Sequence, residues 1–284
     1  MGLAAVVRAE VEVVMAVCNG EPWLEQQVAS VAAQTHPPQR LLALNDGSVD
    51  GCSALLSQLE ARYAGWLQQL PPQPAGQSRG CVVSFGRLLA ATTAPYVAMA
   101  DQDDLWDRDK LARALALLQT EEARGGRDQP LLVHSDARLI DATGRPLHSS
   151  WWRQQGLVSP PRNLWHLAGR NRVMGCTVLL NRACLQAALP LPPEAVLHDW
   201  WLALVACGAG GLLQDPQPSL SHRRHGANLS RPRYGTNLTR RAPWWQTPSK
   251  ALAVWRQWCA CCRRQGRPIT WGDSLRLVWQ RLLG

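Results

Sequence analysis

Three of the four residues in Asp101-Gln102-Asp103-Asp104 are carboxylates, and they directly follow a short apolar run. Carboxylates this close repel one another unless a cation offsets their charge. Oxygen ligands with little nitrogen or sulfur nearby favour Mg²⁺ or Mn²⁺ over zinc. Such an ion bridges to a diphosphate and stabilises charge on a departing phosphate oxygen. The alternative interpretation is an acidic helix N-terminus, where Asp is favoured.

Two more polar clusters follow apolar runs that are typical of buried strands. Cys18-Asn19-Gly20-Glu21 follows Val11–Val17, and Asn45-Asp46-Gly47-Ser48 follows Leu41–Leu44. Between these runs, apolar residues at helical spacing indicate a helix, so the segment predicts a βαβ unit and a parallel sheet. Ligands bind at the carboxyl ends of strands in such sheets. All three polar clusters are therefore expected on one rim.

The rest of the chain alternates between helical and strand-like patterns up to about residue 210. Helices are expected at Asp50–Leu67, Ser84–Thr92, Leu105–Leu118 and Trp200–Cys207, and strands at Tyr96–Ala100, Leu131–Asp136 and Val173–Leu180. From Ser221 onward we expect an irregular basic arm, followed by an amphipathic helix at Ser274–Leu283.

Several nucleotide-binding motifs are absent from the sequence. No G-x-G-x-x-G follows the first strand, which argues against a dinucleotide site, and no G-x-x-x-x-G-K-[ST] occurs, which excludes a P-loop. A nucleotidyltransferase ranks low as well, since the first strand is followed by no Gly-rich basic loop that would activate a nucleoside triphosphate.

The positive charge is concentrated in the last quarter of the chain. Residues 1–215 hold 17 Lys and Arg against 20 Asp and Glu, whereas residues 216–284 hold 13 against one, together with six Trp. This asymmetry predicts a body that does chemistry and a tail that meets something anionic. The tail is either an interfacial anchor near anionic lipid or a partner-docking or poorly ordered extension. We expect no nucleic-acid partner, because no nucleic-acid module is visible.

The chain has nine cysteines, an odd number, and most are scattered through apolar segments. This pattern is typical of buried free thiols in a reducing compartment. The cluster Cys259, Cys261 and Cys262 is an alternative zinc site, although no second Cys or His pair follows it. The longest uncharged apolar run, Trp200–Leu213, is shorter than the about 18 residues that a membrane span requires. We therefore expect a cytoplasmic protein, in peripheral contact with the inner face of the membrane through its basic tail.

The polar clusters occur in an order that resembles the family 2 glycosyltransferases, and most of all their rhamnosyltransferase-like branch. The motifs that carry the resemblance are Asn19-Gly20-Glu21, Asn45-Asp46-Gly47-Ser48, Asp101-Gln102-Asp103-Asp104-Leu105-Trp106, Met174-Gly175-Cys176, His198-Asp199-Trp200-Trp201 and His225-Gly226-Ala227-Asn228. The resemblance implies the GT-A fold, a Rossmann-like α/β fold with a mixed, mostly parallel sheet flanked by helices. We assign residues 9–235 to this catalytic domain and residues 236–284 to a basic, Trp-rich, helical C-terminal extension.

The same resemblance implies a function. It is the inverting, metal-dependent transfer of a hexosyl or rhamnosyl group from a nucleotide-diphosphate sugar to the hydroxyl of a glycan or lipid-linked acceptor. Such a reaction belongs to the biosynthesis of cell-surface polysaccharide or glycan. The donor would be UDP- or dTDP-linked, and the residues that would border its nucleotide are Val17, Asn19, Glu21, Asn45, Asp46, Arg79 and Gly80. Asn45 stands where many members have Asp; it keeps an acceptor oxygen but loses the charge.

The resemblance also implies roles at the reacting centre. Asp101, Asp103 and His225 would form the metal site with Mg²⁺ or Mn²⁺, with Asp101 also near the ribose or sugar. Asp199 would be the catalytic base; taken alone, an Asp before two Trp predicts a helix N-cap. The residues that would contact the donor sugar or the diphosphate are Gln102, Asp104, Trp200, Arg223 and Arg224.

A second class of function also fits the sequence. The chain could be a non-catalytic sugar-nucleotide-binding module or a scaffold subunit of a polysaccharide assembly complex. The set Asp101, Asp103, Asp199 and His225 favours the enzyme, since a pure binder has no need of a base.

Overall fold

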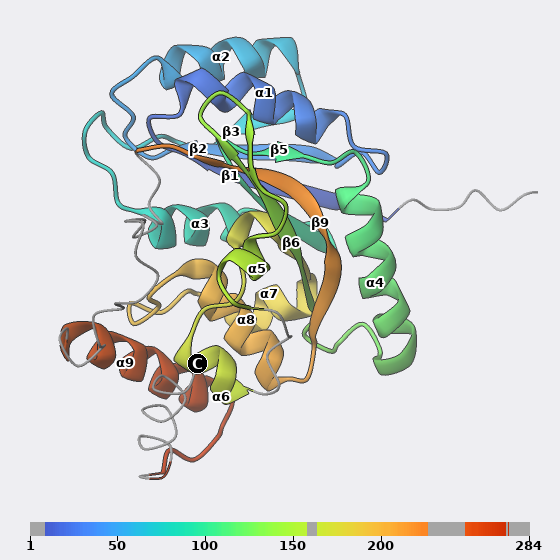
Figure 1. The fold of residues 1–284 in the computed structure, drawn as a ribbon, viewed down its shortest axis with the longest axis vertical. Helices are drawn as coiled ribbons and strands as arrows, with labels where there is room; N and C mark the ends of the chain where they lie inside the picture. The colour runs from blue at the N-terminus through green and yellow to red at the C-terminus, as the bar shows by residue number, and fades with distance from the viewer. Residues whose placement is uncertain (1–8, 158–163, 227–247, 271, 273–284) are drawn as a thin grey trace, which may run out of the picture.

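The computed structural model describes residues 9–157, 164–226, 248–270 and 272. Its strands form one nine-stranded mixed sheet in the order β3-β2-β1-β4-β8-β6-β9-β5, with β7 paired to β6. Helices cover both faces: α1 and α2 lie on one side, and α3, α7 and α8 on the other (Figure 1). The predicted α/β architecture with a mixed, helix-flanked sheet is therefore confirmed.

The strands are β1 (Val11–Val17), β2 (Arg40–Asn45), β3 (Leu67–Gln69), β4 (Tyr96–Asp101), β5 (Leu105–Trp106), β6 (Leu132–Asp141), β7 (Pro146–His148), β8 (Leu179–Asn181) and β9 (Leu212–Arg224). The helices are α1 (Glu21–Ala32), α2 (Cys52–Arg62), α3 (Cys81–Ala90), α4 (Lys110–Gly125), α5 (Trp151–Gln154), α6 (Leu164–Gly169), α7 (Arg182–Ala188), α8 (His198–Gly208) and α9 (Pro248–Arg264), with a 3₁₀ turn η1 at Gly175–Thr177.

The central strand β1 shows why the sheet is buried on both faces. It pairs in parallel with β2 and with β4, and its side chains alternate between two hydrophobic clusters. Val11, Val13, Met15 and Val17 face the cluster built with α1, α2 and α4, whereas Val14 faces the cluster built with α3, α6, α7, α8 and α9. The parallel half of the sheet thus directs three strand ends, those of β1, β2 and β4, to one rim.

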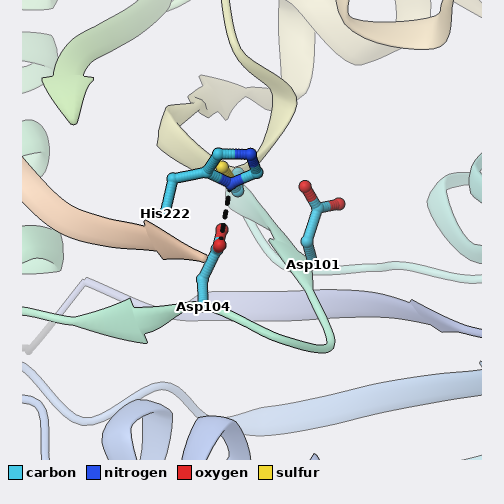
Figure 2. A group of neighbouring side chains, drawn as sticks. Asp101, Asp104 and His222 are labelled. Atoms are coloured by element: carbon cyan, nitrogen blue, oxygen red, sulfur yellow. Dashed lines mark hydrogen bonds and ion pairs between the residues drawn. The ribbon is translucent and has the colours of Figure 1, made fainter. Parts of the chain in front are cut away.

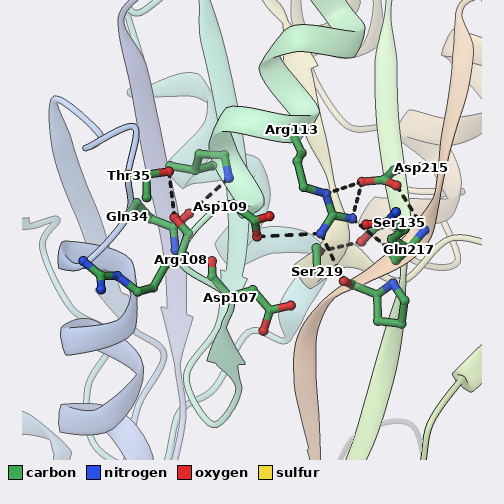
Figure 3. Close-up of polar contacts among 12 residues, drawn as sticks. Gln34, Thr35, Asp107, Arg108, Asp109, Arg113, Ser135, Asp215, Gln217 and Ser219 are labelled. Carbon is green, nitrogen blue, oxygen red and sulfur yellow. Dashed lines mark hydrogen bonds and ion pairs between the residues drawn. The ribbon is translucent and has the colours of Figure 1, made fainter.

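Strand β9 lies between β5 and β6 in the sheet and pairs with both of them. It runs parallel to β6 and antiparallel to β5, with register shifts along β6 at Ser135, Asp136 and Arg138. Near its start, Asp215 accepts hydrogen bonds from the Arg113 guanidinium of α4 and from the Gln217 backbone N–H (Figure 3). This anchored strand carries residues 222–224 back to the acidic cluster.

Helix α9 packs into one of the two hydrophobic clusters, the one built with α3, α6, α7 and α8. Its Trp258, Cys261 and Cys262 are buried with residues of α6 and α8. All nine cysteines lie among the described residues, and none of them forms a disulfide. The boundary expected between residues 235 and 236 lies outside the described residues, and the division into two domains stays a prediction.

Several elements differ from the sequence-based expectations. The helix expected at Leu105–Leu118 begins only at Lys110, because Leu105 and Trp106 pair with β9 as strand β5. Of the strand expected at Val173–Leu180, residues 175–177 form the turn η1 and only residues 179 and 180 belong to a strand, β8, while residues 221–224 of the expected basic arm belong to β9. Strand β3 and helix α9 were not anticipated, and the helix expected at Ser274–Leu283 lies outside the described residues. No described helix combines the length and the apolar character that crossing a bilayer requires.

Candidate active site

The loops after β1 and β2 are tied together by side chains that the sequence analysis singled out. Asn19, which has a left-handed φ of 53°, accepts a hydrogen bond from the Val49 N–H through Oδ1 at 2.8 Å. Glu21 accepts one from the Gly51 N–H at 2.9 Å. Asn45 accepts one at 2.9 Å from the N–H of Ser48, three residues further on, which ties the turn after β2. These three residues therefore shape the rim on which a nucleotide would lie.

Asp46 organises the loop between β3 and α3. Its carboxylate accepts hydrogen bonds from the Ser78 hydroxyl at 2.7 Å and from the backbone N–H groups of Arg79 and Gly80, both at 3.0 Å. Burial opposes ionisation, but these donors outweigh it and hold the pKa of Asp46 below its ordinary value. Arg79 and Gly80, both exposed, are thus brought to the same rim as Asp46.

Two expected nucleotide or donor contacts have structural roles instead. The Val17 side chain is fully buried in the core with α1 and α2, because β1 alternates its side chains and places residue 17 on that face. The Gln102 amide is paired with the backbone of Cys18, donating to its carbonyl at 2.9 Å and accepting from its N–H at 2.7 Å. Gln102 therefore joins the ends of β1 and β4, and Gly20 must lack a side chain to make room for it.

The acidic cluster after β4 is closely packed. Asp101, Asp104 and His222 point toward one another, and His222 Nδ1 lies 2.8 Å from Asp104 Oδ1 (Figure 2). Burial first, and then the carboxylates of Asp104 and Asp103, raise the pKa of Asp101 to about 8. The repulsion anticipated from the sequence is therefore present in the structure, and it requires positive charge nearby.

Part of that positive charge comes from the protein itself. Lys110 is 1% exposed, its Nζ has no hydrogen-bond partner among the described residues, and it lies 4.4 Å from the centroid of the Trp106 ring. Burial lowers the pKa of Lys110 to about 8, while Cys176 and Asp104 raise it. Although burial opposes its charge, Asp104 raises the pKa of His222 to about 9. The inner part of the cluster is thus compensated by two protein cations.

The residues whose side chains cluster, as metal ligands would, differ from the three expected ligands, Asp101, Asp103 and His225. The ligand atoms of Asp101, Asp104, Cys176 and His222 lie within 4.8 Å of one another. With no cation bound, Asp104 raises the pKa of His222, and burial raises the pKa of the Cys176 thiol well above its ordinary value, so both groups favour their protonated forms. Asp103 and His225, two members of the expected set, form a separate pair.

The Asp103–His225 pair lies beside helix α1. His225 Nε2 is 2.6 Å from Asp103 Oδ2, and both side chains are mostly buried. The imidazole stacks on the Trp23 ring at a centroid distance of 4.1 Å. Trp23 is fixed in turn by donating its Nε1–H to the Ala142 carbonyl at 3.1 Å. A carboxylate oxygen and an imidazole nitrogen so placed are suitable ligands for Mg²⁺ or Mn²⁺.

Arg223 has a different role from the expected phosphate contact. It is 2% exposed, and its guanidinium donates to the backbone carbonyls of Asp103 and Ala142 and to the Gln26 side chain. The backbone N–H of Arg223 donates to Asp104 Oδ1 at 3.1 Å. Arg223 thus holds the acidic loop against β9, since its donors are directed to protein oxygens. Arg224, which is half-buried, keeps the phosphate role as a prediction.

Asp199, the expected base, lies in the first turn of α8 rather than at its N-cap, which is Leu197. It is 9% exposed, and burial raises its pKa to about 6 against the opposing effect of three hydrogen-bond donors. Trp200, expected to stack on a sugar, is 5% exposed and donates Nε1–H to the Leu167 carbonyl at 2.7 Å. Trp200 therefore packs in the core, because its position on α8 faces α6 and not the rim.

The structure brings the base close to the acidic cluster through the turn η1. The Gly175 N–H donates to Asp199, while the neighbouring Cys176 belongs to the group around Asp101 and Asp104. On the other side, the thiol of Cys81 at the start of α3 is influenced by both Asp199 and Asp101, which together with burial raise its pKa to about 11. Asp199 and the acidic cluster thus border one region.

Four residues of this region were missed at the level of sequence. Trp23 could have been found from the sequence, because a large aromatic residue that lies off the apolar stripe of α1 needs another packing partner. Lys110 follows Trp106 by four residues, and His222 precedes His225 by three. Asn171 carries no signal that we can identify, since its contact to Asp199 spans 28 residues.

Comparison with known proteins agrees with this geometry. The family model described as glycosyl transferase family 2 matches residues 12–178, which is more than half of the chain. The chain belongs to glycosyl transferase family 2. The match includes β1, the acidic cluster and η1, whereas Asp199 and His225 lie beyond it.

Relatives and solved structures extend the similarity. The chain is 26% identical to the putative teichuronic acid biosynthesis glycosyltransferase TuaG of Bacillus subtilis, over 67% of this chain and 69% of the relative. It is 23% identical to the dTDP-rhamnosyl transferase RfbG of Shigella flexneri, over 76% and 75%. The mannosyltransferase PcManGT from Pyrobaculum calidifontis, solved with GDP-Man and Mn²⁺, superimposes with a TM-score of 0.61 at 16% identity, over 97% of this chain and 70% of that one. The matched region spans less than two thirds of several other curated relatives, for example 40% of the uncharacterized glycosyltransferase alr2836 of Nostoc, to which the chain is 28% identical over 46% of its own length.

Proposed function

We propose that this protein is an inverting glycosyltransferase that moves a sugar from a nucleoside-diphosphate sugar to an acceptor hydroxyl. The observation that carries this function is the position of Asp199, a buried carboxylate with a raised pKa, across the turn η1 from the acidic cluster of Asp101 and Asp104. Inversion requires one base on the face of the sugar opposite the leaving group. The position of Asp199 suits this role.

The chemistry follows from these positions. The acceptor oxygen attacks the anomeric carbon, the bond from that carbon to the diphosphate oxygen breaks, and the acceptor proton moves to the Asp199 carboxylate. The nucleoside diphosphate leaves with the electron pair. Asp46 and the loop Ser78–Gly80 hold the nucleotide end of the donor, and Arg224 meets its phosphates.

A divalent cation fits this site. Asp103 and His225 would hold Mg²⁺ or Mn²⁺, which would supply positive charge to the diphosphate as it departs. The fit rests on the adjacent carboxylate of Asp103 and imidazole of His225, whose 2.6 Å hydrogen bond a cation would replace, and on the carboxylates around Asp101. The Trp23 ring and the hydrogen bonds of Arg223 keep these two ligands in place.

The donor and the acceptor are proposed by class. The name of RfbG supports a dTDP-linked rhamnosyl donor, a similar solved structure in complex with UDP-GlcNAc supports a UDP-linked hexosyl donor, and the name of TuaG supports a role in making a cell-surface polysaccharide. We further propose a glycan or lipid-linked acceptor and peripheral contact with a membrane through the basic C-terminal segment, since its charge suits anionic lipid. A non-catalytic binding module would bind the same donor without consuming it.

Turnover separates the enzyme from the binding module. Purified protein is incubated with Mn²⁺ and a panel of UDP- and dTDP-sugars, and release of the nucleoside diphosphate is measured with and without candidate acceptors. Asp199→Asn should bind UDP or dTDP as the wild type does, yet lose transfer by about 10²–10⁴-fold, the usual contribution of a general base. Asp109→Asn, on the exposed start of α4, is the matched control. Near-normal transfer by Asp199→Asn would refute the assignment of the base.

A further inference from the structure

The two oxygens of the Asp199 carboxylate are not equivalent. Oδ1 accepts two hydrogen bonds, from the Trp200 N–H at 2.6 Å and from the Asn171 side-chain amide at 3.1 Å. Oδ2 accepts one, from the Gly175 N–H at 2.9 Å. A carboxylate oxygen offers about two acceptor directions. Among the described residues, Oδ1 is therefore saturated, and Oδ2 retains one direction for a proton.

We propose that Asn171 is a positioning residue that orients Asp199 so that Oδ2 receives the proton of the acceptor hydroxyl. This role depends on the function proposed above, in which Asp199 is the base. Asn171 touches no reacting atom in this account, because it acts only through the carboxylate of Asp199.

The orientation of the Asn171 amide is itself fixed. Its Oδ1 accepts a hydrogen bond from the Val173 N–H at 3.0 Å, so its NH₂ group is the part that faces Asp199. Val173 is buried in the hydrophobic core and anchors this short segment. The same segment continues to Gly175, which supplies the donor to the other carboxylate oxygen. One stretch of chain, residues 171–175, thus holds both oxygens of the base.

Close packing leaves the carboxylate little freedom. A Cβ placed on Gly175 would lie 3.5 Å from Asp199 Oδ2 and 2.9 Å from His198 Nε2, so the backbone of η1 approaches the base where a side chain would not fit. His198 is packed by stacking on Phe85, with ring centroids 4.0 Å apart. With this wall on one side and the Asn171 amide on Oδ1, rotation of the Asp199 side chain would break at least one of its hydrogen bonds.

Asn171 also affects the charge state of the base. Burial raises the pKa of Asp199, and the Asn171 amide opposes this by donating a hydrogen bond to the ionised form. Loss of the Asn171 donor should therefore raise the pKa of Asp199 further. A negative charge at position 171 should raise the pKa of Asp199 more than loss of the donor alone. The acid limb of the pH profile for transfer reports this change directly.

The decisive variant is Asn171→Asp. Aspartate keeps the oxygen that accepts from Val173, so the local turn is retained, but it loses the donor to Asp199 and adds a like charge. We expect unchanged UDP or dTDP binding, an acid limb shifted up by about two pH units, and for that reason a kcat at pH 7 about tenfold lower. Asn171→Ala, which is neutral, should shift the limb in the same direction by less. Gln217→Glu makes the same amide-to-acid change on the exposed part of β9 and should alter neither quantity.

The outcomes separate this inference from the proposed function. Wild-type kcat and pH profile in Asn171→Asp, with transfer lost in Asp199→Asn, would overturn the role of Asn171 and leave the base in place. Equal losses of kcat in both Asn171 variants without movement of the acid limb would also overturn it, since they would indicate a purely structural effect. Transfer retained by Asp199→Asn would instead remove the proposed function on which the role depends.

Discussion

The hydrogen bonds of Asp46 allow a prediction about how the nucleotide loop is held. In Asp46→Asn the amide oxygen can occupy only one of the two carboxylate positions. With the oxygen at Oδ1, the Arg79 N–H keeps its acceptor and the Gly80 N–H faces an NH₂ group; with the oxygen at Oδ2 the reverse holds. Either orientation leaves one backbone donor without its acceptor and gives the other a neutral acceptor in place of a charged one.

The cost follows from the number and the exposure of these bonds. A hydrogen bond to a charged group contributes about 1.5–3 kcal/mol to stability. Arg79 and Gly80 are exposed, so water replaces part of the loss, and Ser78 Oγ already lies 3.2 Å from the Gly80 N–H. We therefore expect Asp46→Asn to lower the free energy of unfolding by about 1.5 kcal/mol. If the ordered loop is needed for binding, the same energy weakens UDP or dTDP binding by about tenfold.

Two measurements test this account. Urea unfolding followed by Trp fluorescence gives the stability, and calorimetry with UDP or dTDP in the presence of Mn²⁺ gives the affinity. Asp215→Asn is the matched control, because Asp215 also accepts hydrogen bonds from Arg113 and from a backbone N–H, but at the junction of α4 and β9 (Figure 3). The Asp215→Asn variant should have a lower free energy of unfolding and an unchanged affinity for UDP or dTDP. Wild-type stability and affinity in Asp46→Asn would refute the reasoning.

Two further predictions concern the metal pair and the base. Asp103→Ala should abolish the Mn²⁺ dependence of UDP or dTDP binding in calorimetry, because His225 alone is a poor site for such an ion; a dependence equal to that of the wild type would contradict the pair as ligands. Since Asp199 must be ionised to accept a proton and its pKa is raised to about 6, transfer at saturating substrate should fall about tenfold per unit as the pH drops below 6. A rate that stays constant from pH 7 to pH 5 would contradict Asp199 as the base.

The sequence predicted best what is local in the chain. The strands β1, β2 and β4 and the polar clusters at their ends depend on short apolar runs and on the residues that follow them, so the rim could be placed before the structure was known. The repulsion within the acidic cluster was also predictable, because it depends on neighbours in sequence.

What the sequence did not predict depends on distant partners. Residues 221–224 form a strand only because β5 and β6 provide hydrogen-bond partners for them, and a basic composition does not indicate this. The carboxylates of Asp103 and Asp104 look alike in sequence, yet one faces His225 and the other faces His222. Val17, Trp200 and Arg223 were expected to meet a ligand, but the packing of the surrounding elements buries them.

Helix α9 has a consequence for work with shortened versions of this protein. Gln257, which is buried, accepts a hydrogen bond from the Val196 N–H at 2.6 Å, and Arg264 donates to the Leu189 and Pro190 carbonyls. Helix α9 therefore buttresses residues 189–196, the stretch that delivers the chain to Asp199. A truncation at residue 235, where sequence alone would divide the chain, would remove Arg264 from over the Trp201 ring and loosen the segment that leads to Asp199. The basic tail thus contains a piece of the scaffold that positions Asp199.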